Sequence, residues 1–71
     1  MAVEYLLVPS IASDHDVRAI SAALDALQGV LLATVSLPDR RVRVEHIGGI
    51  SIAEIIHAIN QAGYDQVAVL A

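Results

Sequence analysis

The stretch that decides the fold is residues 30–45, which read Val-Leu-Leu-Ala-Thr-Val-Ser-Leu-Pro-Asp-Arg-Arg-Val-Arg-Val-Glu. Its first half is rich in the β-branched and aliphatic residues that strands favour, and Pro38-Asp39 supply a turn. After the turn, Val42 and Val44 alternate with charged residues, which is the period-two pattern of a strand with one buried face. The stretch therefore predicts a β-hairpin whose first strand covers residues 30–37.

A helical pattern lies on each side of this hairpin. Before it, Ser13 and Asp16 have the spacing of a capping box, and after it Ser51 and Glu54 repeat that spacing. Each pair is followed by apolar residues at helical intervals, and a glycine, Gly29 or Gly63, then ends the helix. The apolar stripes are Val17, Ile20, Leu24 and Leu27 in the first helix and Ile52, Ile55, Ile56 and Ile59 in the second.

Short apolar segments at residues 3–8 and 67–70 complete the order β-α-β-β-α-β. This order predicts an α+β fold of the ferredoxin-like type, in which two helices cover one face of an antiparallel four-stranded sheet. A chain of 71 residues has room for one domain, which we expect to span residues 1–71.

Strand alternation assigns side chains to the two faces of this sheet. We expect one face to lie under the helices and the other to be uncovered, and the uncovered face combines apolar and arginine side chains. This composition suits a protein interface, and the residues of this possible interaction face are Tyr5, Leu7, Arg41 and Arg43. Leu6, Val8, Ala33, Val35, Val42 and Val44 are predicted to face the helices, and Thr34 and Glu45 the uncovered side.

Composition excludes several classes of function. The formal net charge is −4 and three of the four basic residues fall within residues 40–43, so the chain lacks the broad positive surface that nucleic-acid binding needs. The sequence shows neither a signal peptide nor an apolar run long enough to cross a bilayer, so a cytoplasmic location without direct membrane insertion is expected. Cysteine is absent, which rules out disulfides and thiolate ligands.

Taken together in order, several phrases of the chain resemble the heavy-metal-associated domain family, the small metallochaperones and the N-terminal domains of metal-transporting P-type ATPases. The resemblance covers almost the whole chain and implies the ferredoxin-like fold. The phrases are Val17-Arg18-Ala19-Ile20 through Leu24, Leu27-Gln28-Gly29-Val30, Val42-Arg43-Val44, Ser51-Ile52-Ala53-Glu54-Ile55, and Ala58-Ile59 leading to Ala62-Gly63-Tyr64-Asp65.

The family binds soft metals through a Gly-Met-Thr-Cys-x-x-Cys loop, and the matching residues 10–16 here read Ser-Ile-Ala-Ser-Asp-His-Asp. Both cysteine positions are changed, to Ser13 and Asp16, so the motif is replaced by Ser13-Asp14-His15-Asp16. A copper(I) thiolate site is therefore excluded. The implied alternative is a harder site in which Asp14, His15 and Asp16 bind a divalent ion such as zinc, nickel, cobalt or copper(II).

A simpler interpretation of the same residues needs no metal. Ser13 and Asp16 cap the helix, and the positive end of the helix dipole stabilises the carboxylates of Asp14 and Asp16. Among the other candidates, His57 is expected to face solvent. His46 is either an ordinary strand-end residue or a ligand between molecules. The loop of Tyr64 lies beside the metal loop in the resembled fold, so Tyr64 either covers the site or, as we expect, lies at the core edge with its hydroxyl in water.

No catalytic constellation is present, so we expect a module that is not an enzyme. The first hypothesis is a metal-homeostasis domain that binds or transfers a divalent ion, with the metal and a membrane transporter domain as partners. The second is a degenerate domain without metal binding that serves protein interaction or self-association. A third, a small-molecule sensor, is disfavoured because the loop after the first strand lacks the glycine typical of such sites.

Overall fold

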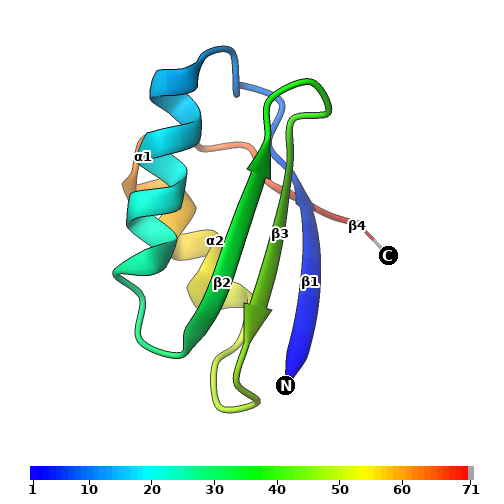
Figure 1. Cartoon of the computed structure of the whole chain (residues 1–71), viewed down its shortest axis with the longest axis vertical. Coiled ribbons are helices and arrows are strands. Elements are labelled where there is room, and N and C mark those ends of the chain that lie inside the picture. The colour runs from blue at the N-terminus through cyan, green and yellow to red at the C-terminus, as the bar shows by residue number, and fades with distance from the viewer. Residues whose placement is uncertain (71) are drawn as a thin grey trace.

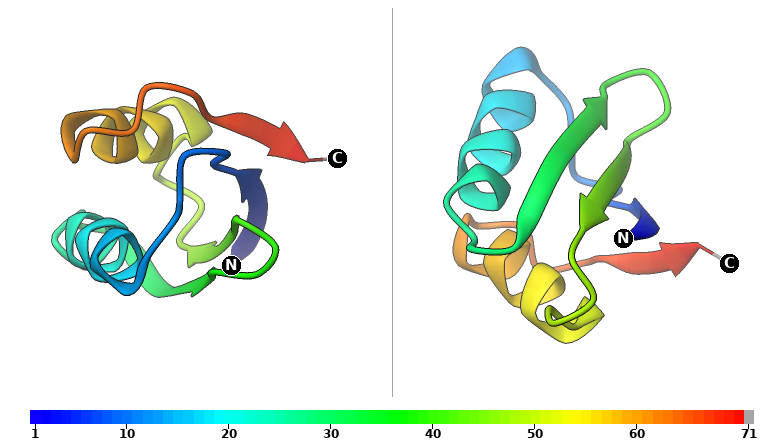
Figure 2. Two further views of the ribbon diagram at one scale, coloured as in Figure 1. Left: turned by 90° about the horizontal axis from the view of Figure 1, so that it is seen from above. Right: turned by 60° about the horizontal axis from the view of Figure 1, so that its bottom comes forward.

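The computed structural model describes residues 1–70 and has the predicted element order (Figure 1). The elements are β1 (Ala2–Leu7), α1 (Asp14–Asp25), β2 (Val30–Ser36), β3 (Arg41–His46), α2 (Ile52–Gln61) and β4 (Ala68–Leu70). The strands form one sheet in the order β2-β3-β1-β4, and each neighbouring pair is antiparallel. Both helices lie on the same side of this sheet, as the view from above in Figure 2 shows. The predicted fold class is confirmed.

The core lies between the sheet and the helices and is almost entirely aliphatic. The alternation predicted from the sequence is confirmed on the two central strands, because Leu6, Val42 and Val44 are fully buried under the helices. From the helices, Ile20, Leu24, Ile55 and Ile59 fill the other side of the same cluster. Since interiors are close-packed, this meshing of branched side chains fixes how the helices sit on the sheet.

Gly63 ends α2 as predicted, whereas α1 ends before the glycine that was predicted to end it. α1 stops at Asp25, and Gly29, at φ 105°, makes the turn into β2. At the end of α2, Gly63 has φ 107°, its N–H donates to the Asn60 carbonyl at 3.0 Å, and the Tyr64 N–H donates to the Ile59 carbonyl at 3.3 Å. This pair of bonds is a Schellman motif, which needs a left-handed residue at the position of Gly63.

Strand β2 departs from regular pairing near its start. The register with β3 shifts between Val30 and Leu32, and Leu31 and Leu32 are 57% and 52% exposed. A bulge of this kind adds an unpaired residue and increases the local twist. The strand predicted over residues 30–37 is present as Val30–Ser36, and its pairing with β3 is irregular at its first residues.

Within residues 1–70, neither helix has the length and apolar character required to span a membrane.

Candidate functional site

The side chain of Asp16, in the first turn of α1, folds back onto the loop between β1 and α1 and accepts hydrogen bonds from its backbone. Its Oδ2 accepts a hydrogen bond from the Ala12 N–H at 2.8 Å and another from the Ser13 N–H at 3.2 Å. The bond from Ser13 is one half of the predicted capping box. Ile11, 1% exposed, anchors the same loop in the core. The loop and the first turn of α1 therefore satisfy each other's hydrogen bonds, and no metal ion is needed to hold them together.

The other carboxylate oxygen of Asp16 is bonded to a residue 48 positions away. The Tyr64 hydroxyl donates to Asp16 Oδ1 at 2.5 Å. Tyr64 is held at the end of α2 by the Schellman motif and is 8% exposed. The expectation of a core-edge aromatic is thus confirmed, and its hydroxyl, which was expected in water, also donates to a carboxylate.

This contact shifts both titrating groups. The Tyr64 hydroxyl, followed by the Ala12 and Ser13 amides, lowers the pKa of the Asp16 carboxyl below its ordinary value of 3.8. The same hydrogen bond raises the pKa of the Tyr64 hydroxyl above 10.0. The largest cause of both shifts is this one hydrogen bond, since it is strongest between an ionised acceptor and a protonated donor. We refer to the Asp16–Tyr64 contact as the loop latch.

The remaining two residues predicted as metal ligands stay outside this network. Asp14 and His15 open α1 and both are exposed. Within the part of the chain that the structure describes, no three side chains of His, Cys, Asp or Glu are grouped so that they could hold a metal ion. His57 is exposed on α2, as predicted.

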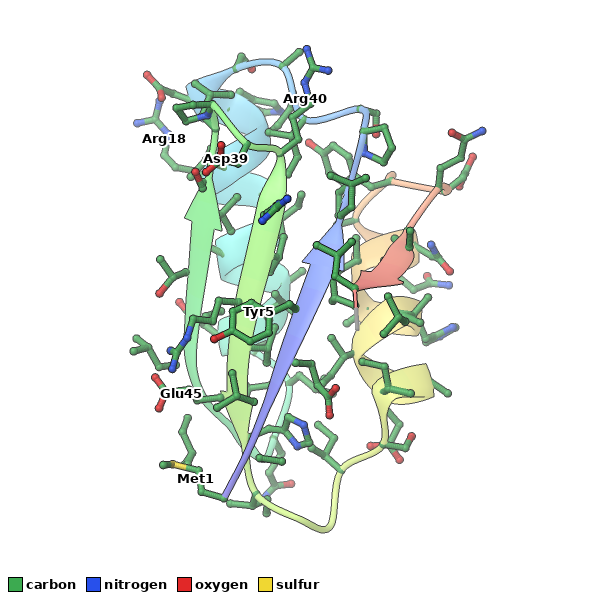
Figure 3. All side chains as sticks on the ribbon, turned by 90° about the vertical axis from the view of Figure 1, so that its right-hand side faces the viewer. Met1, Tyr5, Arg18, Asp39, Arg40 and Glu45 are labelled. Carbon is green, nitrogen blue, oxygen red and sulfur yellow. The ribbon has the colours of Figure 1, made fainter. Side chains whose placement is uncertain are left out.

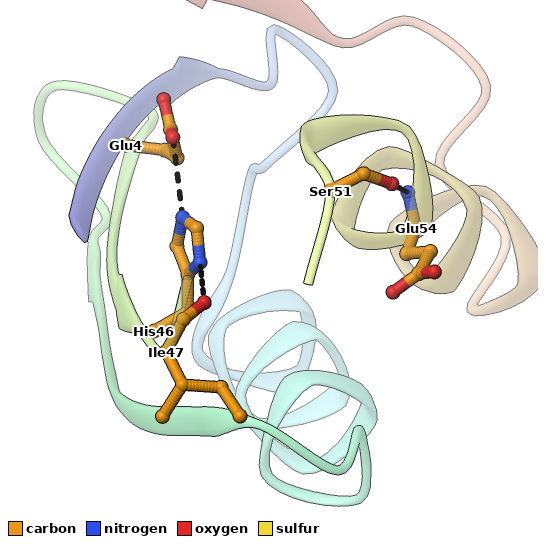
Figure 4. A network of polar contacts seen from close by, with 5 residues as sticks. All are labelled: Glu4, His46, Ile47, Ser51 and Glu54. Carbon is orange, nitrogen blue, oxygen red and sulfur yellow. Dashed lines mark hydrogen bonds and ion pairs between the residues drawn. The ribbon is translucent and has the colours of Figure 1, made fainter. Parts of the chain in front are cut away.

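The third histidine, His46, lies at the other end of the sheet and is only 3% exposed (Figure 4). Its Nε2 lies 3.1 Å from Glu4 Oε2 on β1, and its Nδ1 lies 2.8 Å from the Ile47 carbonyl oxygen. Burial removes the option of a ligand between molecules. The Glu4 partner was missed, although strand alternation places Glu4 on the helix side with Leu6, and His46 there with Val44.

The uncovered sheet face carries the residues predicted for it, and Figure 3 views the molecule from this side. The registers define three rows across the strands. The first row is Leu32–Glu45–Val3, the second is Thr34–Arg43–Tyr5–Leu70, and the third is Ser36–Arg41–Leu7–Ala68. We call these three rows the open face.

A small polar network occupies the centre of the open face. Arg43 Nη1 donates to Glu45 Oε2 at 2.8 Å, and Arg43 Nε donates to the Tyr5 hydroxyl at 3.4 Å. The Tyr5 hydroxyl and then Glu45 raise the pKa of the Arg43 guanidinium. Arg41, by contrast, belongs to neither of the two ion pairs found within residues 1–70, which are Arg43–Glu45 and His46–Glu4.

No protein-family model matches the sequence, and no curated protein matches it. Solved structures do match over nearly the full length. A copper-binding domain of the P-type ATPase HMA7 is 25% identical, with a TM-score of 0.94 over 100% of this chain and 96% of that one. The CopZ metallochaperone is 26% identical, with a TM-score of 0.85 over 97% and 100% of the two chains.

Oxidized MerP from Ralstonia metallidurans CH34 is 21% identical and shares the fold, with a TM-score of 0.91 over 99% of this chain and 97% of its own. These neighbours confirm the resemblance inferred from the sequence. The chain has the fold of the heavy-metal-associated domains, built here from a sequence that contains no cysteine.

Proposed function

We propose that this chain is a non-enzymatic binding domain of the heavy-metal-associated fold whose partner is a protein, and that its β1–α1 loop works without a metal. The observation that carries the proposal is the loop latch. Asp16 stands where the resembled family has its second cysteine, and its two oxygens already accept bonds from Tyr64, Ala12 and Ser13.

A metal ion would have to compete with these bonds. An ion bound to Asp16 would draw charge from the carboxylate that accepts the Tyr64 hydroxyl, and would weaken that hydrogen bond. Without Asp16, only His15 and Asp14 remain at the helix start, and an ion there would also face the positive end of the α1 dipole. Two exposed ligands at the positive end of a helix dipole are not enough for tight binding of a metal ion.

The open face supports the part of the proposal that assigns a protein partner. Val3, Tyr5 and Leu32 expose 36%, 47% and 52% of their surface on the sheet side that neither helix covers. Tyrosine and arginine are enriched in protein interfaces, and this face carries Tyr5 beside Arg41 and Arg43. Exposed apolar side chains beside tyrosine and arginine have the composition of a protein interface.

The test is a titration of the isotope-labelled chain with zinc, nickel, cobalt and copper(II), followed by amide NMR. The proposal expects no saturable response confined to residues 13–17 and Tyr64. His15→Ala and His57→Ala serve as matched variants, because both histidines are exposed and lie on helices. A saturable response in the loop that is lost in His15→Ala and kept in His57→Ala would overturn the metal-free proposal.

That outcome would establish the second candidate function, capture of a divalent ion by His15 with Asp14 or Asp16. It is favoured by the exposure of His15 and by the similarity to a copper-binding domain of a P-type ATPase. Under this alternative the chain is a metal-homeostasis module whose partners are the ion and a transporter domain. Copper(I) stays excluded, because thiolates are absent.

A further inference from the structure

We infer that the partner of the open face is a second copy of this chain, which packs face to face across a twofold axis. The inference rests on the proposed function, because it takes the open face as the binding surface.

Charge complementarity along β3 is the main argument. Arg41, Arg43 and Glu45 point to the open face at every second position. Arg41 is an unpaired cation at one end of β3 within the described residues, and Glu45 at the other end is an anion that already carries one ion pair, with Arg43 of its own copy. A twofold axis that lies between the sheets and crosses β3 at Arg43 reverses the strand direction. Arg41 of each copy then lies over Glu45 of the other.

The same operation pairs apolar side chains. On β1, Leu7 of one copy lies over Val3 of the other, because their rows exchange places about the axis. The Tyr5 rings meet at the axis, where aromatic side chains contribute large contact areas. The two Arg43 side chains also approach there, and each is already paired with its own Glu45 and Tyr5 hydroxyl. The central contact therefore brings no unpaired like charges together.

The size of the face sets the expected strength. The open face fits within the longest and shortest extents of the molecule, 31 and 18 Å. A standard interface buries roughly 800 Å² on each partner. Association would have to use the whole face to approach that area, so we expect a reversible dimer that forms at high concentration.

The first experiment measures mass against concentration by sedimentation equilibrium, from micromolar to millimolar chain. The second uses Arg41→Glu and Glu45→Arg. Each variant alone places like charges opposite each other in the dimer, whereas a mixture of the two restores an opposite pair at both contacts. Arg18→Glu is the matched control for Arg41→Glu, because it makes the same charge change at an exposed position of α1, away from the face.

We expect wild type and Arg18→Glu to dimerise with the same dissociation constant, each β3 variant alone to dimerise at least tenfold more weakly, and the mixture to form a heterodimer. Circular dichroism checks that every variant is folded. If Glu45→Arg does not fold, filtered NOEs between labelled and unlabelled wild-type copies at Tyr5 provide the same test.

A wild-type chain that stays monomeric at millimolar concentration would overturn the inference, as would dimerisation that Arg41→Glu leaves unchanged. Either result would leave the metal-free proposal standing, because that proposal fails only on a loop response to metal. The two failures are therefore distinguishable.

Discussion

Replacing His46 with alanine removes a buried ring that ties the end of β3 to β1 and to the following turn. The ring faces two acceptors, the Glu4 carboxylate and the Ile47 carbonyl, so at least one ring N–H donates a hydrogen bond in any protonation state. Such a bond contributes about 0.5–1.5 kcal/mol if it goes to the Ile47 carbonyl and about 1.5–3 kcal/mol if it goes to the Glu4 carboxylate. The lost packing of the ring adds to this, so we expect the free energy of unfolding to fall by about 2–4 kcal/mol.

That loss is large for a domain of this size, whose whole stability is about 4–10 kcal/mol. It corresponds to a decrease in melting temperature of about 8–32 °C. The assay is urea and thermal unfolding followed by circular dichroism, with His57→Ala as the control because His57 is exposed. Glu4→Gln, which keeps the shape of the partner and removes its charge, should give a smaller loss. Equal stability of the His46→Ala and His57→Ala variants would refute this account of the buried histidine.

Three further predictions concern the loop latch and the backbone. The folded pKa of Asp16 lies below 3.8, so the stability that the loop latch contributes is present above pH 3.8 and is lost as the pH falls through the lowered pKa. The folded pKa of Tyr64 lies above 10.0, so the same stability is present below pH 10.0 and is lost as the pH rises through the raised pKa. Tyr64→Phe should therefore flatten the acid and alkaline limbs of a stability profile measured by denaturant unfolding, and unchanged limbs would contradict the latch. Gly29→Ala should cost more than about 1 kcal/mol, because φ is 105° and the new Cβ would lie 3.2 Å from Ile47 Cγ1, whereas Gly48→Ala, with nothing within 4 Å, should fold with near wild-type stability in the same assay. Arg40, a non-glycine residue at φ 56°, should gain thermal stability on change to glycine, and a lower melting temperature would show that its side chain matters more than its backbone.

The sequence by itself determined the layout of the molecule and one limit on its chemistry. Alternation in residues 30–45, capping residues before two apolar stripes, and Gly63 after the second stripe each depend on neighbours a few positions apart. Such local patterns report which face of an element is buried, so the element order, the two helices on one side and the make-up of the open face could be predicted. The missing cysteines excluded a copper(I) thiolate site without any structure.

The tertiary structure alone decided what the candidate ligands do. Asp16 meets Tyr64 across 48 positions of sequence and His46 meets Glu4 across 42, and neither pair belongs to one local pattern. Asp14, His15 and Asp16 are adjacent and polar, and the chain direction at the start of α1 decides which of them points toward Tyr64. The position of Tyr64 in turn depends on where the end of α2 packs. Only the folded chain therefore showed that Asp16 is held by a hydroxyl while Asp14 and His15 remain in solvent.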